Sequence, residues 1–339
     1  MKKMKNSLLI FLTVLFIVVS FAGSCTKTDN RIPVIFDTDA NNELDDQHAL
    51  AYLLFNADVF DTKAITVNAT SNGGDIDEQY AEALRIVKLC KADGKVPLLK
   101  GANKSFNEIE TSLNNATFDG APAVNFIIDE ALKYSPDNKL VVLAVGKLTN
   151  VALAVKKEPR ITDKIRLVWL GANYPEPGEY NLVNDIPSMN FLLDTNIEFE
   201  MVTVRYHKDS GTDHVKVFKK DVLDREIMKG LGPKTDVPVI GRHGGEFYCF
   251  GDYSHSLFEH CKFHGEEQYR ALFDMAAVAI VKNPVWAKTT VIPAPIMIDK
   301  KWVERPENGR RIVLWEYFDR DAIMKDFMES LRNYSLVKK

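Results

Sequence analysis

Acidic side chains gather near the start of the chain, where an apolar run gives way to a helix-like pattern. Asp37, Asp39, Asp45 and Asp46 fall within ten residues. Carboxylates this close repel one another, and a helix N-terminus offsets only part of that repulsion. A bound divalent cation offsets more, and oxygen ligands without a nearby cysteine favour a hard ion such as Ca²⁺ or Mg²⁺. The alternative is that Asp45 or Asp46 caps the helix while its neighbours are solvated.

Polar residues that suit a sugar stand just past the other apolar runs that we interpret as strands. They are Asn72, Thr149, Asn150, Asn173, Glu179 and Asn181. Amide and carboxylate groups suit a polyhydroxylated ligand, because each sugar hydroxyl both donates and accepts a hydrogen bond. A phosphate would instead call for backbone nests, lysine or arginine. Taken one at a time, these asparagines are also ordinary turn residues.

The elements that must position these residues follow from hydrophobic periodicity. We expect strands at residues 33–36, 64–67, 96–99, 140–145, 165–170, 289–298 and 311–315, and helices at 46–55, 77–92, 121–133, 151–157, 269–282 and 321–333. Strands that alternate with helices predict an α/β fold: a Rossmann-like, mostly parallel sheet with helices on both faces. Such a sheet binds ligands at the carboxyl ends of its strands, where the polar residues stand.

Composition limits the class of protein. The chain has 339 residues, of which 46% are hydrophobic and 27% charged, with a formal net charge of −4. This suits one large α/β domain or two modest ones. Without a basic field or a long basic run, we expect no nucleic-acid partner. We expect a small-molecule ligand as partner and allow for a homo-oligomer.

The N-terminus predicts export. Lys2, Lys3 and Lys5 precede an uncharged 15-residue run, 8–22, that leads through two small residues to Cys25. This is typical of a lipoprotein signal, with Cys25 lipidated, although Ala22 stands where the motif usually has leucine. The alternative is an uncleaved anchor, for which 15 residues are short. We therefore expect an exported lipoprotein, held only by its lipid anchor at the periplasm or outer membrane of a Gram-negative bacterium.

The expected organisation is a signal peptide at 1–24, a spacer at 25–31 and an α/β domain at 32–339, with 207–269 as a lid or small subdomain. Three cysteines would remain beside Cys25, namely Cys90, Cys249 and Cys261. Cys249 and Cys261 either pair in an oxidising periplasm or stay buried free thiols.

The order and spacing of these motifs resemble the inosine–uridine-preferring nucleoside hydrolases over about residues 33–285. The motifs are Val34 to Asp46, Ile65 to Asn72, Val96 to Gly101, Gly146 to Asn150, Glu158 to Ile161, Asn173 with Glu179 to Asn181, and Asp274 to Ala279. The resemblance implies Ca²⁺-dependent hydrolysis of the N-glycosidic bond of ribonucleosides to ribose and free base. It also implies a nucleoside hydrolase-like fold.

Residue roles follow from the same resemblance. Asp39, Asp46, Asp274 and the backbone carbonyl of Thr149 would bind Ca²⁺, and Asp39 would be the general base for a metal-activated water. Partners of the ribose 2′- and 3′-hydroxyls would be Asp45, Asn72, Asn181 and Asp274, and partners of the 5′-hydroxyl would be Asn173 and Glu179. Asp37 would support the site from behind. These residue types also suit the oxocarbenium-like sugar of glycosidic cleavage.

The sequence departs from the family in two respects. Five residues, Ala40 to Leu44, separate Asp39 from Asp45, where the usual turn has three, so Asn41 or Asn42 can reach the ligand instead. Phe273 stands where one family branch has a histidine that protonates the leaving base, and Asp119-Gly120 replaces a His-Gly motif. The leaving-group acid is therefore unassigned. Candidate donors are His243, Tyr248, His255, His260 and His264, and Phe247, Tyr248 and Phe250 are candidates for stacking on the base.

Other functions compete with this interpretation. A haloacid dehalogenase-type phosphatase also has Asp-x-Asp after a strand, but it leaves Asn173, Glu179 and Asn181 unexplained. A non-catalytic ribose- or carbohydrate-binding lipoprotein would keep the sugar ligands without needing an activated water. A hydrolase of another N- or O-riboside would use the same ring chemistry.

Overall fold

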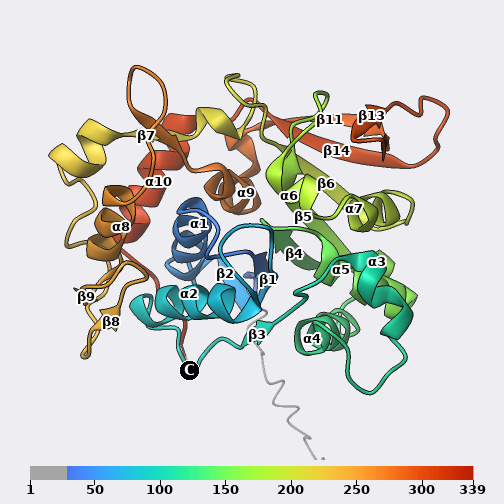
Figure 1. Cartoon of the computed structure of the whole chain (residues 1–339), viewed down its shortest axis with the longest axis horizontal. Coiled ribbons are helices and arrows are strands. Elements are labelled where there is room, and N and C mark those ends of the chain that lie inside the picture. Colours follow the sequence, from blue (N-terminus) through green and yellow to red (C-terminus); the bar gives the residue numbers. More distant parts are fainter. Residues whose placement is uncertain (1–28, 339) are drawn as a thin grey trace, which may run out of the picture. The chain divides into compact units, whose positions relative to one another are not determined.

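A computed structural model describes residues 29–338 (Figure 1). The expected signal peptide and Cys25 lie outside the described residues. The chain from Arg31 onward forms one compact unit. No helix among the residues described here has the length and apolar character needed to cross a membrane.

An eight-stranded sheet forms the centre of this unit, in the order β11-β14-β6-β5-β4-β1-β2-β3. All neighbours pair in parallel except β11, which is antiparallel to β14. The strands are β1 (Ile32–Thr38), β2 (Phe60–Val67), β3 (Leu98–Lys100), β4 (Leu140–Ala144), β5 (Ile165–Ala172), β6 (Glu198–Thr203), β11 (Lys288–Pro293) and β14 (Arg311–Glu316). The direction of strand succession reverses between β1 and β4, which is where such sheets bind ligands.

Helices cover both faces of the sheet, as Figure 1 shows. One face carries α1 (Asp45–Leu54), α2 (Ile76–Leu89), α8 (Phe250–Glu259), α9 (Phe273–Lys282) and α10 (Arg320–Arg332). The other carries α3 (Phe106–Ile109), α4 (Ala121–Ala131), α5 (Thr149–Lys157) and α7 (Ile186–Leu193). Successive residues of β1 enter opposite cores, Val34 and Phe36 on the first side and Ile35 on the second. This explains why the central strands are continuously apolar.

The remaining elements are short. They are α6 (Tyr180–Asn184), β7 (Lys216–Phe218), β8 (Val239–Ile240), β9 (Glu246–Phe247), β10 (Tyr269–Ala271), β12 (Ile296–Ile298) and β13 (Lys301–Val303). The strands pair as β7 with β10, β8 with β9 and β12 with β13, each pair antiparallel. The segment 207–269 contains β7, β8, β9 and α8, which are joined by short helical turns and loops.

The predicted fold class is confirmed, but several elements differ from the sequence expectation. The strand expected at 289–298 is divided into β11 and β12, which belong to different sheets, and α7 and α8 were not expected. Strand β6 was not expected, because two glutamates interrupt its apolar run. Glu200 is nevertheless buried, since it accepts hydrogen bonds from Arg166 and from the indole of Trp315. The expected helix at 269–282 begins only at Phe273, because residues 269–271 form β10. The helix expected from Val151 begins at Thr149.

The three cysteines in the described part of the chain, Cys90, Cys249 and Cys261, are free thiols. Cys249 is buried and its Sγ donates to the Asp252 carboxylate at 3.3 Å, whereas the Sγ of Cys261 donates to the Phe258 carbonyl oxygen at 3.4 Å. Of the two arrangements that the sequence allowed, the structure holds the unpaired one.

Candidate active site

A cavity of about 320 Å³ opens at the carboxyl ends of β1, β4 and β5. Residues that follow these strands form its floor, and the starts of α1 and α9 form one wall. Tyr206, His207 and His264 are exposed and form its rim. The cavity therefore lies at the carboxyl ends of the strands, where the sequence placed the ligand site, and at the point where the strand order reverses.

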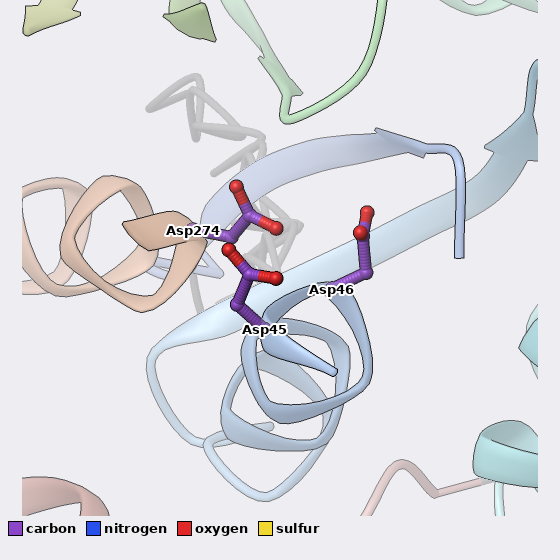
Figure 2. Close-up of side chains that lie close together, drawn as sticks. All are labelled: Asp45, Asp46 and Asp274. Carbon is purple, nitrogen blue, oxygen red and sulfur yellow. The ribbon is translucent and has the colours of Figure 1, made fainter. Parts of the chain in front are cut away.

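Three buried carboxylates meet in this cavity. Figure 2 shows Asp45 and Asp46 at the start of α1 and Asp274 at the start of α9, with their side chains directed to the same region. Ligand oxygens of the three lie within 4.8 Å of one another, and none of the three residues is more than 5% exposed. Burial, followed by repulsion from neighbouring carboxylates, raises the pKa of Asp46 and Asp274 well above the ordinary value. Such an arrangement is costly without a cation.

Asp39 stands beside this group at the end of β1. Its Oδ2 accepts a hydrogen bond from the Thr70 hydroxyl at 2.5 Å, while its buried Oδ1 has no partner among the described residues. Burial raises the pKa of Asp39 to about 7. The Thr38 hydroxyl donates to Asp46 at 2.5 Å and so links the end of β1 to α1. Asp39 thus offers one unsatisfied carboxylate oxygen inside the cavity.

Asp37 lies behind the cavity and does not line it. Its carboxylate accepts hydrogen bonds from Thr66 (2.5 Å), Asn68 (2.7 Å) and Asn150 (2.7 Å). Burial nevertheless raises its pKa to about 6. The side chain therefore ties β1, β2 and α5 together beneath Asp39.

Glu179 and Asn181 enter the cavity from the loop that follows β5. Glu179 caps α6 by accepting from the amide of Leu182 at 2.9 Å, and burial raises its pKa to about 7. Asn181 donates through Nδ2 to the carbonyl oxygens of Val145 (2.7 Å) and Leu170 (3.2 Å). The Oδ1 of Asn181 is buried and unpartnered among the described residues. Asn72 lines the cavity from an exposed position.

Two predicted site residues do not line the cavity. Thr149 is the first residue of α5, so its carbonyl points along the helix as an intrahelical acceptor, and its hydroxyl donates to Asp185. Val145, which directly follows β4, lines the cavity instead. Asn173 donates to the Pro177 carbonyl at 3.3 Å and accepts from the Tyr206 amide at 3.1 Å, so it shapes a loop.

In the longer turn between Asp39 and Asp45, some residues line the cavity and others hold neighbouring loops. Asn42 and Glu43 line the cavity. Asn41 is turned away, because its side chain donates to the Gly73 carbonyl at 2.8 Å and its amide donates to Gln79 at 2.7 Å. Of the two asparagines that the sequence offered as ligand partners, the structure places Asn42 at the site.

Of the candidate proton donors in the segment 207–269, only His264 lines the cavity among the described residues. His243 and His260 stack on each other, with centroids 4.3 Å apart, in a neighbouring hollow, and His255 contacts the Val222 carbonyl. Tyr248 is exposed, Phe247 packs on Tyr253, and Phe250 is fully buried. None of these three aromatics lines the cavity, so the stacking role expected for them has no support here.

Several lining residues had not been singled out as functional, among them Tyr206, His207, Asp213 and Arg270. Tyr206 and His207 follow β6, which the sequence analysis did not predict. Their position after a strand end could therefore not be recognised. Arg270 lies within the expected helix 269–282, and only its place in β10 turns it toward the cavity wall.

Comparisons with known proteins agree with this geometry. A sequence model described as inosine-uridine preferring nucleoside hydrolase matches residues 34–331. The chain is 35% identical over 219 residues to the protein of that name from Leishmania major, covering 60% of this chain and 63% of that one. It is 31% identical over 191 residues to the protein of that name from Crithidia fasciculata, covering 54% of each chain. The match thus spans under two thirds of the first relative and about half of the second.

A solved structure supports the same fold. A plant nucleoside hydrolase superposes with a TM-score of 0.67 at 18% identity, over 88% of this chain and 98% of that one. The family model covers nearly the whole described domain, and the residues that it spans include the carboxylates gathered in the cavity. The chain therefore belongs to the inosine-uridine preferring nucleoside hydrolase family.

Proposed function

We propose that this protein is a Ca²⁺-dependent hydrolase that cleaves the N-glycosidic bond of ribonucleosides to give ribose and free base. The observation that carries the proposal is the meeting of Asp45, Asp46 and Asp274 in a sugar-sized cavity that also holds Asp39. A phosphatase would need a cationic or backbone cradle for phosphate, whereas this floor is acidic.

The donor set fits a hard divalent cation. Burial is the main cause that raises the pKa of Asp274, and the charged groups that raise it further are all carboxylates: Asp45, Asp46, Asp39 and Glu179. The Oδ1 of Asp39 has no hydrogen-bond partner among the described residues, and Val145, whose carbonyl oxygen accepts from Asn181 at 2.7 Å, lines the same cavity. Asp39, Asp46, Asp274 and Val145 would therefore hold the ion, with Val145 in the place first expected for Thr149. All are oxygen donors, which Ca²⁺ prefers.

Each residue of the site then has a separate role in the proposed reaction. A bound divalent cation would supply positive charge that favours the ionised carboxylates and lowers the pKa of a nearby water. Asp39 accepts a proton of the attacking water. Asp45, Asn72, Asn181 and Asp274 hold the 2′- and 3′-hydroxyls, and Glu179 holds the 5′-hydroxyl. The carboxylates around the ring stabilise the positive charge that develops on the sugar as the C1′–N bond breaks.

Metal removal tests the proposal directly. We expect the purified protein to release ribose from inosine or uridine, to lose this activity in excess chelator, and to regain it with Ca²⁺. Asp46→Ala should lose bound Ca²⁺ by calorimetry and activity by at least about 100-fold. Asp129→Ala, an exposed aspartate on α4, is the matched control and should bind Ca²⁺ normally. Full activity in excess chelator contradicts the metal requirement, and ribose binding without base release identifies a carbohydrate-binding protein instead.

We also propose that the protein is exported and anchored through a lipid on Cys25. The support is the sequence pattern alone: the lysines before residue 8, the uncharged run 8–22 and the small residues before Cys25. The active domain begins near Arg31, so a short spacer would separate it from the anchor.

A further inference from the structure

Position 273 poses a problem for the proposed hydrolysis. Phe273 lines the cavity next to the Asp274 carboxylate, and a phenyl ring cannot donate a proton to a departing base. Any hydrogen-bond donor to the leaving base must therefore come from another residue of the cavity wall. This inference rests on the proposed function and asks which residue of this chain supports the leaving group.

We propose that Arg270 stabilises the leaving base, and that Glu43 in the long turn positions it. Arg270 belongs to β10, lines the cavity and is only 7% exposed. Its Nε is buried with no hydrogen-bond partner among the described residues. A buried guanidinium N–H without a hydrogen-bond partner costs free energy. An acceptor atom of a bound ligand would supply the missing partner.

The turn residue Glu43 holds the guanidinium in place. Its carboxylate forms an ion pair with the Nη2 of Arg270, and Glu43 itself is half exposed. Glu43 belongs to the turn that is two residues longer than the usual family turn. The longer turn therefore supplies a carboxylate that orients Arg270 while its Nε remains free. The other amino group, Nη1, lies 3.4 Å from the Nε2 of His264 on the rim.

The neighbouring walls are suited to a planar ring. Tyr206 and Phe273 meet edge to face, with centroids 5.9 Å apart, and both line the cavity. Aromatic faces bind heterocyclic rings through stacking, while a guanidinium reads acceptor atoms at a ring edge. The arrangement thus separates an acidic floor for the sugar from an aromatic and cationic wall for the base.

The step balances without a proton donor at position 273. The C1′–N bond breaks and its electron pair goes to the base, which departs as an anion beside Arg270. The oxygen of water bonds to C1′, and the proton of that water goes to Asp39. The base later takes a proton from solvent, and Arg270 keeps its own protons throughout. A base with acceptor atoms, such as the oxo group and ring nitrogen of hypoxanthine, suits this wall better than adenine with its amino donor.

Leaving-group dependence tests the role of Arg270. In the Ca²⁺-loaded full-length protein we expect Arg270→Gln to lower kcat/KM for inosine by about 100-fold or more. The same variant should change turnover of p-nitrophenyl riboside less than about 3-fold, because p-nitrophenolate is stable without assistance. Glu43→Gln should lower kcat for inosine, with KM and p-nitrophenyl riboside little changed. Arg270→Lys, which keeps charge but not the fork, should recover part of the loss.

Controls separate this role from folding and from the proposed function. Arg305→Gln removes an arginine whose ion pair with Asp194 lies outside the cavity, and it should match wild type on both substrates. Equal losses on both substrates in Arg270→Gln, or wild-type inosine turnover in that variant, overturn the proposal. So does a selective loss on inosine in His264→Ala but not in Arg270→Gln. If wild type cleaves neither riboside, the proposed function itself fails.

Discussion

The buried carboxylates at the site are held at an energetic cost. Burial raises the pKa of Asp37 to about 6 and that of Glu179 to about 7, and Asp46 and Asp274 are shifted in the same direction. These groups have higher pKa values in the folded metal-free protein than in the unfolded chain. The folded form therefore binds more protons between about pH 4 and pH 7, and its stability falls as the pH rises through that window.

We expect the midpoint of urea unfolding of the metal-free protein to be lower at pH 8 than at pH 5. Ca²⁺ added at pH 8 should raise the midpoint again, because the ion binds the folded state and compensates the carboxylates. Asp46→Asn removes one charge without changing shape, so it should be more stable than wild type when metal-free at pH 8 and respond less to Ca²⁺. Midpoints that are equal at both pH values, with and without Ca²⁺, contradict this account.

At the scale of elements, α2 anchors the loops that shape the site. Gln79 on its inner face is fully buried, accepts from the Asn41 amide at 2.7 Å and donates to the Asn72 carbonyl at 3.2 Å. Gly73 is necessary between them, because a Cβ there would lie 2.6 Å from the Asn41 backbone. One side chain therefore connects the long turn to the loop that carries Asn72.

Gln79→Ala should leave these backbone groups unpaired and destabilise the protein by about 1–3 kcal/mol. It should also raise KM for inosine, because the turn and Asn72 would no longer be held together. Lys88→Ala, on the exposed face of the same helix, should change stability by less than about 0.5 kcal/mol. Urea unfolding and steady-state kinetics measure both effects. A loss of stability with unchanged KM would show that the connection does not serve binding.

At the scale of the whole molecule, the domain from Arg31 onward contains both cores and every described site residue. The proposed anchor would therefore determine where the protein is located, and it would contribute no residue to the active site. The N-terminal segment can be altered without touching the cavity residues, which makes export and catalysis separable by experiment.

We expect the native bacterium to incorporate labelled palmitate into this protein and Cys25→Ala to abolish the label. Cys261→Ala, which removes a partly buried thiol in the folded domain, is the control and should keep the label. The unlabelled Cys25→Ala protein should retain riboside hydrolysis. A protein recovered from the cytoplasm with Met1 intact contradicts export.

Local patterns in the sequence determined the fold class and the side of the sheet that carries the site. Strand and helix periodicities are local, and parallel strands bring their carboxyl ends to one edge, so Asp39, Asn72, Glu179 and Asn181 could be placed together in advance. Strand β6 was not predicted, because its buried Glu200 is stabilised by residues of other strands. These are Arg166 and Trp315, which donate hydrogen bonds to it.

Only the tertiary structure decided which groups meet. Val145 lines the cavity and Thr149 does not, because Thr149 is the first residue of α5, which begins two residues earlier than expected. Asp274 reaches Asp45 and Asp46 because α9 packs beside α1. Arg270 lines the cavity because it belongs to β10 and not to the helix that follows. Glu43 forms an ion pair with it from the long turn. Such contacts depend on element boundaries and packing between distant segments, which local periodicity does not encode.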